Sequence, residues 1–281
     1  MIRLALLGRP VAHSRSPAMM RAAFDAMGLE GAYVACDVAP EALGDALRGL
    51  AALGFDGANV TVPHKVAVME LAAAVDDDAR LAGAVNTLVR SSDGGFRGSN
   101  TDIDGLREAL AHHGVRAKGE RAVVLGGGGA ARAAAVALAR EGAARVDVVA
   151  RRFAAARAVA EVASRAGTEG RAHRLGDASV ASALGETSVV VQATSCGMAG
   201  AGDCAELLAG APLVACARGA AAVDLVYAPA VTEWMRAAEG AGLRVCEGAG
   251  ARMLAAQGAA ALARWTGREA PVAVMRAALG L

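Results

Sequence analysis

One lysine, Lys65, is a candidate for proton transfer. The chain has 29 basic residues, and two of them, Lys65 and Lys118, are lysine. Lysine can lose its proton when its surroundings lower its pKa, whereas arginine stays charged. A dehydrogenase acting on an alcohol must move a proton as the hydride moves. Lys65 closes the run Gly57–Lys65 and is a candidate for that role, although a solvated residue at a helix start is the alternative. Lys118 lies in a polar linker, so we predict that it is a surface residue.

Neutral hydrogen-bonding side chains occupy similar positions at strand ends and helix starts, where α/β proteins place ligands. Several placed donors and acceptors suit a small molecule with hydroxyl and carboxylate groups. Asp102 either caps a helix or holds Lys65. We predict that His64 is structural and that His112 and His113 lie on the surface. The candidate ligand-binding residues in this first part of the chain are Ser14, Ser16, Thr61, Asn86 and Asp102.

A glycine-rich turn follows the apolar run Arg121–Leu125 and opens an alanine-rich stretch. The pattern Gly126-x-Gly128-x-x-Ala131 fits the dinucleotide-binding fingerprint, which needs a strand before it and a helix after it. The glycines allow a tight turn and a close approach of the backbone to pyrophosphate, while free N–H groups at the helix start bind phosphate. A plain tight turn, or a site for another nucleotide-like ligand, is the alternative.

The cofactor type depends on the end of the next strand. An acidic residue there holds the ribose of NAD, whereas arginine favours the 2′-phosphate of NADP. Asp147 has the spacing of the acidic residue, but it lies inside the predicted strand. Arg151 and Arg152 follow that strand directly, and we predict that they clamp a 2′-phosphate. The alternative is that both arginines only solubilise the start of a helix.

The composition excludes several classes of protein. The 281 residues carry a net charge of +1 and only 3% aromatic side chains, which argues against nucleic-acid binding. No apolar stretch is long enough to cross a bilayer, and no secretory signal is evident. Five cysteines without C-x-x-C spacing indicate neither a metal site nor a disulfide framework. We therefore expect a reduced, cytoplasmic protein with two domains or one large α/β unit.

Strand-like and helix-like segments alternate along the chain. In the first hundred residues we predict strands at 2–7, 33–38 and 57–62, a hairpin of 86–90 with 96–97, and helices at 16–27, 40–53 and 65–75. Further on we predict a helix at 101–113, strands at 121–125, 146–150, 188–191, 223–227 and 243–245, and helices to Arg140 and at 153–165. In this second part of the chain, such alternation predicts a parallel sheet covered on both faces.

Eight motifs in order resemble the shikimate dehydrogenase family, which includes shikimate and quinate dehydrogenases. The resemblance covers essentially the whole chain. Its motifs are residues 8–17, Asn59–Lys65, Gly83–Thr87, Asn100–Asp102, Gly126–Ala130, Gln192–Met198, Asp224–Thr232 and Gly250–Gln257.

The resemblance implies an α/β substrate domain at 1–100, a Rossmann NADP domain with a doubly wound parallel sheet at 101–240, and C-terminal helices at 241–281 that pack back on the substrate domain. A cleft would lie between the two domains. The implied reaction is the NADP-dependent reduction of 3-dehydroshikimate to shikimate, in the route to chorismate and aromatic amino acids.

Residue roles follow from the same resemblance. Lys65 would accept the proton of the C3 hydroxyl, with Asp102 as its partner, and Ser14 and Ser16 would hold the substrate carboxylate. The hydroxyls and ring would be held by Thr61, Asn86, Asp102, Tyr227 and Gln257. The cofactor would be lined by Gly126, Gly127, Gly128, Gly129, Ala130, Arg151, Arg152, Leu225 and Gly250.

The sequence departs from the family pattern at Met20, Ala150 and Gln192, where histidine and, twice, asparagine are usual. A quinate/shikimate dehydrogenase that uses NAD or both cofactors is therefore an alternative. A catalytically silent dinucleotide-binding regulator is another, although Lys65 and Asp102 argue against it. A monomer or a homodimer with no macromolecular ligand is expected.

Overall fold

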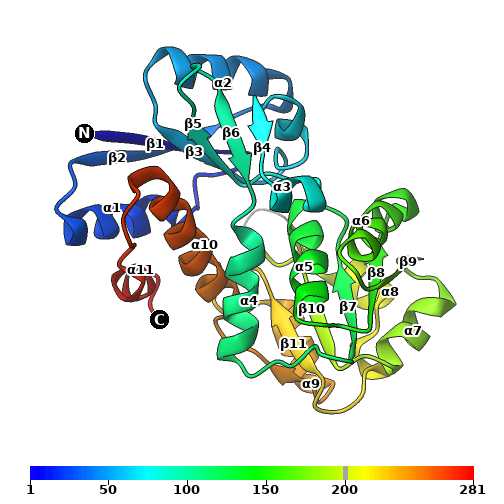
Figure 1. Cartoon of the computed structure of the whole chain (residues 1–281). Coiled ribbons are helices and arrows are strands. Elements are labelled where there is room, and N and C mark those ends of the chain that lie inside the picture. Colours follow the sequence, from blue (N-terminus) through cyan, green and yellow to red (C-terminus); the bar gives the residue numbers. More distant parts are fainter. Residues whose placement is uncertain (199–201) are drawn as a thin grey trace. The chain divides into compact units, whose positions relative to one another are not determined.

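Two compact units make up the chain. The computed structural model describes residues 1–198 and 202–281 (Figure 1). The first unit comprises residues 1–105 and 254–281, and the second comprises residues 106–253. Within the described residues, each unit holds one six-stranded sheet. The ranges 1–100, 101–240 and 241–281 stay a prediction of the domain limits.

The first unit contains a mixed sheet with the strand order β2-β1-β3-β5-β6-β4. Strand β1 pairs in parallel with β2 and β3, whereas β5 is antiparallel to both β3 and β6, as the predicted hairpin requires. The predicted hairpin is therefore confirmed. The strands are β1 (Ile2–Gly8), β2 (Gly31–Asp37), β3 (Gly57–Val60), β4 (Ala74–Val75), β5 (Thr87–Arg90) and β6 (Phe96–Ser99).

Alternation along β1 explains how the first unit builds its core. Leu4 and Leu6 pack in one apolar cluster with Met20, while Ala5 and Leu7 pack in a second cluster. Side chains of a strand point alternately to opposite faces, so β1 contributes to a core on each side of the sheet. Residues of α1 (Ser16–Met27), α10 (Ala249–Thr266) and α11 (Val272–Ala278) join the first cluster, and residues of α2 (Leu43–Ala52) join the second.

The predicted helix at 65–75 is wrong. The segment forms a turn, a short 3-10 helix at Ala67–Glu70 and then β4, before α3 begins at Asp77 and runs to Ala82. The backbone N–H groups of Ala73 and Asp76 donate to the carbonyl groups of Phe96 and Gly98 in β6, at 2.9 Å each. Pairing with a distant strand therefore overrides the local apolar spacing. A further 3-10 turn, Pro40–Ala42, precedes α2.

The second unit contains a fully parallel sheet with the order β12-β11-β10-β7-β8-β9. This is the strand order of a Rossmann fold. From β7 the chain adds β8 and β9 on one side of the sheet and then β10, β11 and β12 on the other side, so the order of addition reverses between β7 and β10. The prediction of a parallel sheet is confirmed here. The strands are β7 (Arg121–Leu125), β8 (Arg145–Ala150), β9 (Glu169–Arg174), β10 (Val189–Gln192), β11 (Ala221–Asp224) and β12 (Arg244–Val245).

Edge strand β9 was not predicted, because its residues are polar and lack an apolar alternation. The helices of this unit are α4 (Asp102–His112, which begins in the first unit), α5 (Gly129–Arg140), α6 (Phe153–Arg165), α7 (Ala178–Gly185), α8 (Ala205–Gly210) and α9 (Glu233–Gly240), together with a 3-10 turn at Leu213–Ala215. In the part of the chain that the structure describes, no helix is both long and apolar enough to cross a membrane.

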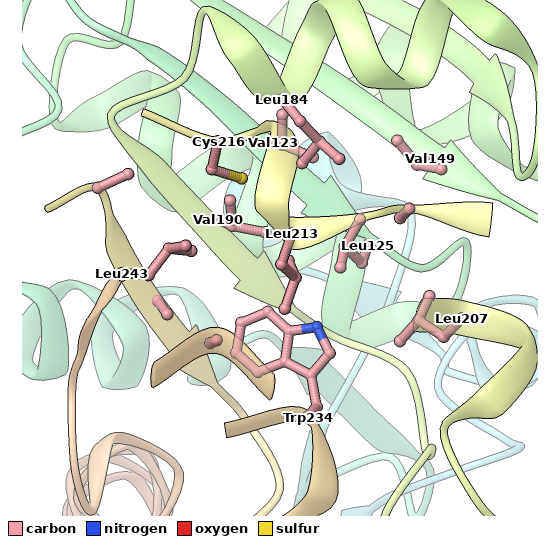
Figure 2. Packing of buried hydrophobic residues seen from close by; sticks show 14 of the residues in the cluster. Val123, Leu125, Val149, Leu184, Val190, Leu207, Leu213, Cys216, Trp234 and Leu243 are labelled. Carbon is pink, nitrogen blue, oxygen red and sulfur yellow. The ribbon is translucent and has the colours of Figure 1, made fainter. Parts of the chain in front are cut away.

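A dense apolar cluster fixes one face of the parallel sheet. Figure 2 shows the indole of Trp234 from α9 among side chains of the strands and of the Leu213 turn. Trp234 is fully buried, as are Val123 and Val190 of the central strands. The cluster extends to Leu207 in α8. Packing of this kind holds the strand ends rigidly, which a ligand site at those ends requires.

A disulfide corrects one sequence prediction. Cys196 and Cys204, eight residues apart, are bonded to each other, although the cysteine spacing indicated no disulfide. Both residues lie between the end of β10 and the start of α8, and their pairing follows no sequence motif. Cys36, Cys216 and Cys246 are free thiols. Among the described residues, no group of three or more His, Cys, Asp or Glu side chains is arranged to hold a metal ion.

Candidate active site and cofactor-binding loop

Lys65 and Asp102 form a nearly buried ion pair in the first unit. Lys65 Nζ donates to Asp102 Oδ2 at 2.6 Å, and the two side chains are 16% and 5% exposed. Lys65 lies in the turn after β3, and Asp102 is the first residue of α4. The two residues are 37 positions apart, so the fold brings together the predicted lysine and its predicted partner. Lys118, in contrast, is exposed, as predicted.

Asn86 connects this pair to a second group of polar side chains. Asn86 Nδ2 donates to Asp102 Oδ1 at 2.9 Å and to Gln257 Oε1 at 3.2 Å. Its other amide atom, Oδ1, accepts the backbone N–H of Thr101 at 2.7 Å. Asn86 is 2% exposed and Gln257, on α10, is 7% exposed. Both oxygens of Asp102 are therefore engaged, and the carboxylate has a fixed orientation.

Behind Asn86 lies a buried layer of hydrogen bonds. Asn59 Nδ2 donates to the Asn86 carbonyl and to Thr87 Oγ1, at 3.1 Å each. Tyr33 OH donates to Asn59 Oδ1 at 2.9 Å. Buried polar groups with complete hydrogen bonding rigidify the residues that they contact. Sequence reasoning did not select Tyr33, Thr87 or Asn59 as site residues, although the last two lie in the quoted motifs.

The remaining predicted substrate residues of the first unit lie on neighbouring segments. Ser16 is buried as the first residue of α1, and its backbone N–H donates to Ser14 Oγ at 3.3 Å. Thr61 directly follows β3, and its backbone N–H donates to the Leu7 carbonyl at 2.8 Å. His64 is buried with Nε2 at 2.8 Å from the Val38 carbonyl, which confirms its structural role.

The glycine loop of the second unit has the predicted setting between β7 and α5. Gly126 has φ +136°, and a β-carbon there would lie 3.0 Å from the Ala193 carbonyl oxygen at the end of β10. Gly128 is the N-cap of α5, and a β-carbon there would meet no described heavy atom within 4 Å. The first turn of α5 contains no acidic residue. The loop therefore leaves room and free N–H groups for a phosphate. Gly127, Gly129 and Ala130 complete the loop.

The residues after β8 distinguish the two cofactor types. Arg151 and Arg152 are exposed between β8 and α6. Asp147 is 1% exposed inside β8, where it accepts hydrogen bonds from Arg145 Nε at 2.6 Å and His173 Nε2 at 2.8 Å. Burial opposes its charge, but these two hydrogen bonds outweigh burial and lower the pKa of Asp147. Each of its two oxygens accepts one of these hydrogen bonds and the carboxylate is buried, so it is not placed to hold a ribose.

A buried carboxylate, Asp224, organises the ends of two neighbouring strands. Its oxygens accept Thr232 Oγ1 at 2.6 Å, the Val226 N–H at 2.9 Å and Gln192 Nε2 at 3.3 Å. Burial raises the pKa of Asp224 to about 6, against the opposing effect of the hydrogen bonds from Thr232 and Val226. Gln192 Nε2 also donates to the Cys196 carbonyl at 3.1 Å, so this side chain joins the loop after β10 to the end of β11.

The loop after β11 carries Leu225 and Tyr227, both half-buried. The predicted strand at 223–227 is wrong in its bounds, because β11 comprises Ala221–Asp224. A β-carbon at Gly250 would lie 2.6 Å from the Val226 carbonyl and 2.8 Å from the Leu225 carbonyl, so only glycine allows this contact. The second unit thus brings Leu225 and Gly250 together, as the cofactor prediction requires.

Comparisons with known proteins agree with these features. Residues 6–88 match the family described as "Shikimate dehydrogenase substrate binding domain", and residues 250–279 match "Shikimate 5'-dehydrogenase C-terminal domain". A protein of Citrifermentans bemidjiense named shikimate dehydrogenase (NADP(+)) is 45% identical over 277 residues, which cover 98% of this chain and 93% of that protein.

Solved structures share the fold along the whole chain. The Thermus thermophilus shikimate 5-dehydrogenase, in complex with NADP(H) and shikimate, has a TM-score of 0.82 at 38% identity, covering 100% of this chain and 99% of that chain. A quinate dehydrogenase from Corynebacterium glutamicum, in complex with NAD, has a TM-score of 0.83 at 32% identity with the same coverage.

Proposed function

Because this chain belongs to the shikimate dehydrogenase family, we propose that it is an enzyme that interconverts shikimate and 3-dehydroshikimate with NADP as cofactor. The observation that carries the proposal is the Lys65–Asp102 pair, with 2.6 Å between Nζ and Oδ2 and with Asn86 on the second carboxylate oxygen. A buried lysine beside a fixed carboxylate is a suitable proton-transfer group. Curated relatives carrying the NADP-dependent name span nearly the whole chain, which supports the same activity.

Proton transfer is assigned to Lys65. In the oxidation of shikimate, the C3–H bond breaks as a hydride leaves and the C3 hydroxyl loses its proton. Lys65 Nζ accepts that proton after it has released its own, and the ammonium group that results forms the ion pair with Asp102 Oδ2. The nicotinamide of NADP, when bound, supplies the hydride acceptor. In the reverse direction Lys65 returns the proton to the oxygen of the reduced ketone.

Orientation of the substrate is assigned to the neutral polar residues. Asn86 and Gln257 are held by each other and by Thr101, so their positions are set before a ligand arrives. Ser14 and Ser16 would hold the carboxylate. Thr61 and, from the second unit, Tyr227 would hold hydroxyls and the ring. Fixed donors and acceptors reduce the entropy lost on binding.

The chain's own residues fit NADP. The glycine loop with Gly128 at its open end suits the pyrophosphate, and exposed Arg151 and Arg152 suit a 2′-phosphate. Asp147 is occupied by Arg145 and His173, which removes the acidic residue that an NAD ribose would use. Leu225 and Gly250 would line the cofactor from the loop after β11.

A second candidate is a dehydrogenase that also accepts quinate or NAD. Ala150 at the end of β8 offers no side-chain hydrogen bond to the 2′-phosphate, which favours a less strict choice of cofactor. The similarity to a quinate dehydrogenase in complex with NAD supports the same candidate.

An assay with four mixtures, shikimate or quinate each with NADP⁺ or NAD⁺, separates these candidates. The absorbance of the reduced cofactor measures the rate in each mixture. We expect the highest kcat/KM with shikimate and NADP⁺, and a value at least about tenfold lower when NAD⁺ replaces NADP⁺. A kcat/KM with quinate or with NAD⁺ that lies within about tenfold of the value with shikimate and NADP⁺ would support the second candidate. Absence of turnover in all four mixtures, with shikimate or quinate and either cofactor, would refute both.

We also propose that the protein works in the cytoplasm as a monomer or homodimer. Its net charge of +1 supports the absence of a nucleic-acid partner. Cytoplasmic reductants keep such cysteines as thiols, so the Cys196–Cys204 disulfide would belong to the oxidised protein. Thiol titration of protein purified with and without a reductant tests whether the disulfide forms. The oxidised protein should show three thiols and the reduced protein five.

A further inference from the structure

Arg151, the predicted anchor of the 2′-phosphate, already has an anionic partner in the protein. Arg151 Nη1 lies 3.5 Å from Glu206 Oε2, and the two side chains are 75% and 69% exposed. Arg151 follows β8, whereas Glu206 lies 55 residues later on α8. The pair is therefore a contact created by the fold of the second unit.

Glu206 is held beside Arg151 by the attachment of α8. The residue before the helix, Cys204, is bonded to Cys196, and its backbone N–H donates to Glu233 Oε2 at 3.0 Å. Leu207, the next residue after Glu206, is part of the apolar core of this unit. The hydrogen bond and the core packing thus fix the start of α8 also when the two cysteines are thiols, and Glu206 projects from it to the surface.

A guanidinium group binds a carboxylate or a phosphate with the same set of N–H donors. A phosphate monoester carries about two negative charges near pH 7, so the Glu206 carboxylate both competes for Arg151 and repels such a group. Arg152 has no ion pair within the described residues, so Arg151 is the arginine that this competition affects.

From this geometry we propose that Glu206 is a specificity-determining residue that weakens the binding of the 2′-phosphorylated cofactor and narrows the preference for NADP over NAD. The proposal rests on the proposed function, because it assigns the 2′-phosphate to Arg151. It assigns no catalytic role to Glu206.

Calorimetry tests the proposal. It measures the Kd of NADP⁺ and of NAD⁺ for the full chain, as the wild type and as Glu206→Gln. Glutamine keeps the size of the side chain and removes its charge. We expect the Kd for NADP⁺ to fall about 3- to 10-fold at low salt, while the Kd for NAD⁺ changes by less than about 1.5-fold. Adenosine 2′-monophosphate should respond as NADP⁺ does, and adenosine 5′-monophosphate should not respond.

Glu161→Gln is the matched control. Glu161 is an exposed glutamate on α6 that pairs with Arg157 at 3.6 Å, so its loss changes the net charge equally without touching Arg151. It should leave both cofactor affinities within about 1.5-fold of wild type.

Other outcomes would overturn the proposal in distinguishable ways. An unchanged Kd for NADP⁺ in Glu206→Gln would show that the pair does not compete, and weaker NADP⁺ binding would show that Glu206 orients Arg151 for the phosphate. If the Kd for NAD⁺ fell as much as the Kd for NADP⁺, or if Glu161→Gln lowered the Kd for NADP⁺ equally, the effect would come from the change in net charge and not from the contact with Arg151. Failure of the wild type to bind NADP⁺ at all would overturn the proposed function itself.

Discussion

One ion pair from each unit, Lys65 with Asp102 and Arg151 with Glu206, can be compared, and the two pairs differ in burial and in distance. Lys65 and Asp102 are 16% and 5% exposed, at 2.6 Å. Arg151 and Glu206 are 75% and 69% exposed, at 3.5 Å. Water and salt weaken the second pair but hardly reach the first. The buried pair is thus organised before any ligand arrives, whereas Arg151 is free to exchange its partner for a ligand phosphate.

The largest effect on kcat should come from removal of the basic residue of the buried pair. Lys65→Ala should lower kcat for shikimate oxidation by about 10³-fold, because a positioned acid or base contributes about 10² to 10⁴. The Kd for NADP⁺ should stay within about twofold of wild type. Steady-state kinetics and calorimetry of the same preparation provide both values.

Lys118→Ala is the control for loss of a lysine, since Lys118 is exposed. It should retain the kcat of the wild type and its melting temperature. A Lys65→Ala variant with nearly normal kcat would remove the chemical role from the buried pair.

Asp224 extends the comparison, because it is a buried carboxylate whose hydrogen-bond donors are a hydroxyl, a backbone N–H and a side-chain amide. Its pKa of about 6 lies above the ordinary 3.8, so the folded protein holds this proton more tightly than the unfolded chain. The stability from this group is complete below about pH 3.8 and is lost as the pH rises through about 6.

Relative to Asp224→Asn, the wild type should therefore lose about 2 kcal/mol in free energy of unfolding between about pH 4.5 and 7.5. Urea titrations at both pH values measure this difference. A constant difference between the two proteins across this range would mean that Asp224 titrates normally.

Removal of the exposed basic residue should affect binding and not turnover. Arg151→Ala should raise the Kd for NADP⁺ about tenfold and leave the Kd for NAD⁺ within about twofold, because only NADP carries the 2′-phosphate. At saturating cofactor, kcat should be close to that of the wild type. Equal weakening of the two cofactors would place the 2′-phosphate elsewhere.

A change in salt concentration should give the smallest difference between the exposed pair and the buried pair. Raising NaCl from about 50 to 500 mM should increase the Kd for NADP⁺ about threefold, because exposed charges are screened. The kcat at saturating substrates should change by less than about 1.5-fold, since the buried pair is shielded from ions. A parallel fall in kcat would indicate that salt reaches Lys65.

Sequence reasoning predicted those parts of the fold that local pattern determines. The strand–glycine–helix unit around Gly126 and the helix Phe153–Arg165 are confirmed, because turn residues and apolar spacing encode them locally. The helix expected at 65–75 is wrong because β4 pairs with β6, a contact that no local pattern signals. The parallel pairing of β9 was missed for the same reason.

The candidate site divides in a similar way. Lys65, Asp102 and Asn86 were selected from residue type and motif, and the structure brings them into contact. The layer behind them, in which Tyr33 donates to Asn59, depends on side chains from separate strands and was not selected. Glu206 gave no signal at all, because an exposed glutamate on a short helix is common and only the fold brings it to Arg151.

The most direct test of the central claim is a double-mutant cycle on the buried pair, with kcat for shikimate oxidation measured for Lys65→Ala, Asp102→Ala and the double variant. If Lys65 and Asp102 act as one proton-transfer unit, their losses are not additive, and the double variant should be within about threefold of Lys65→Ala. Losses that multiply in the double variant would contradict the account, because the two side chains would then act independently.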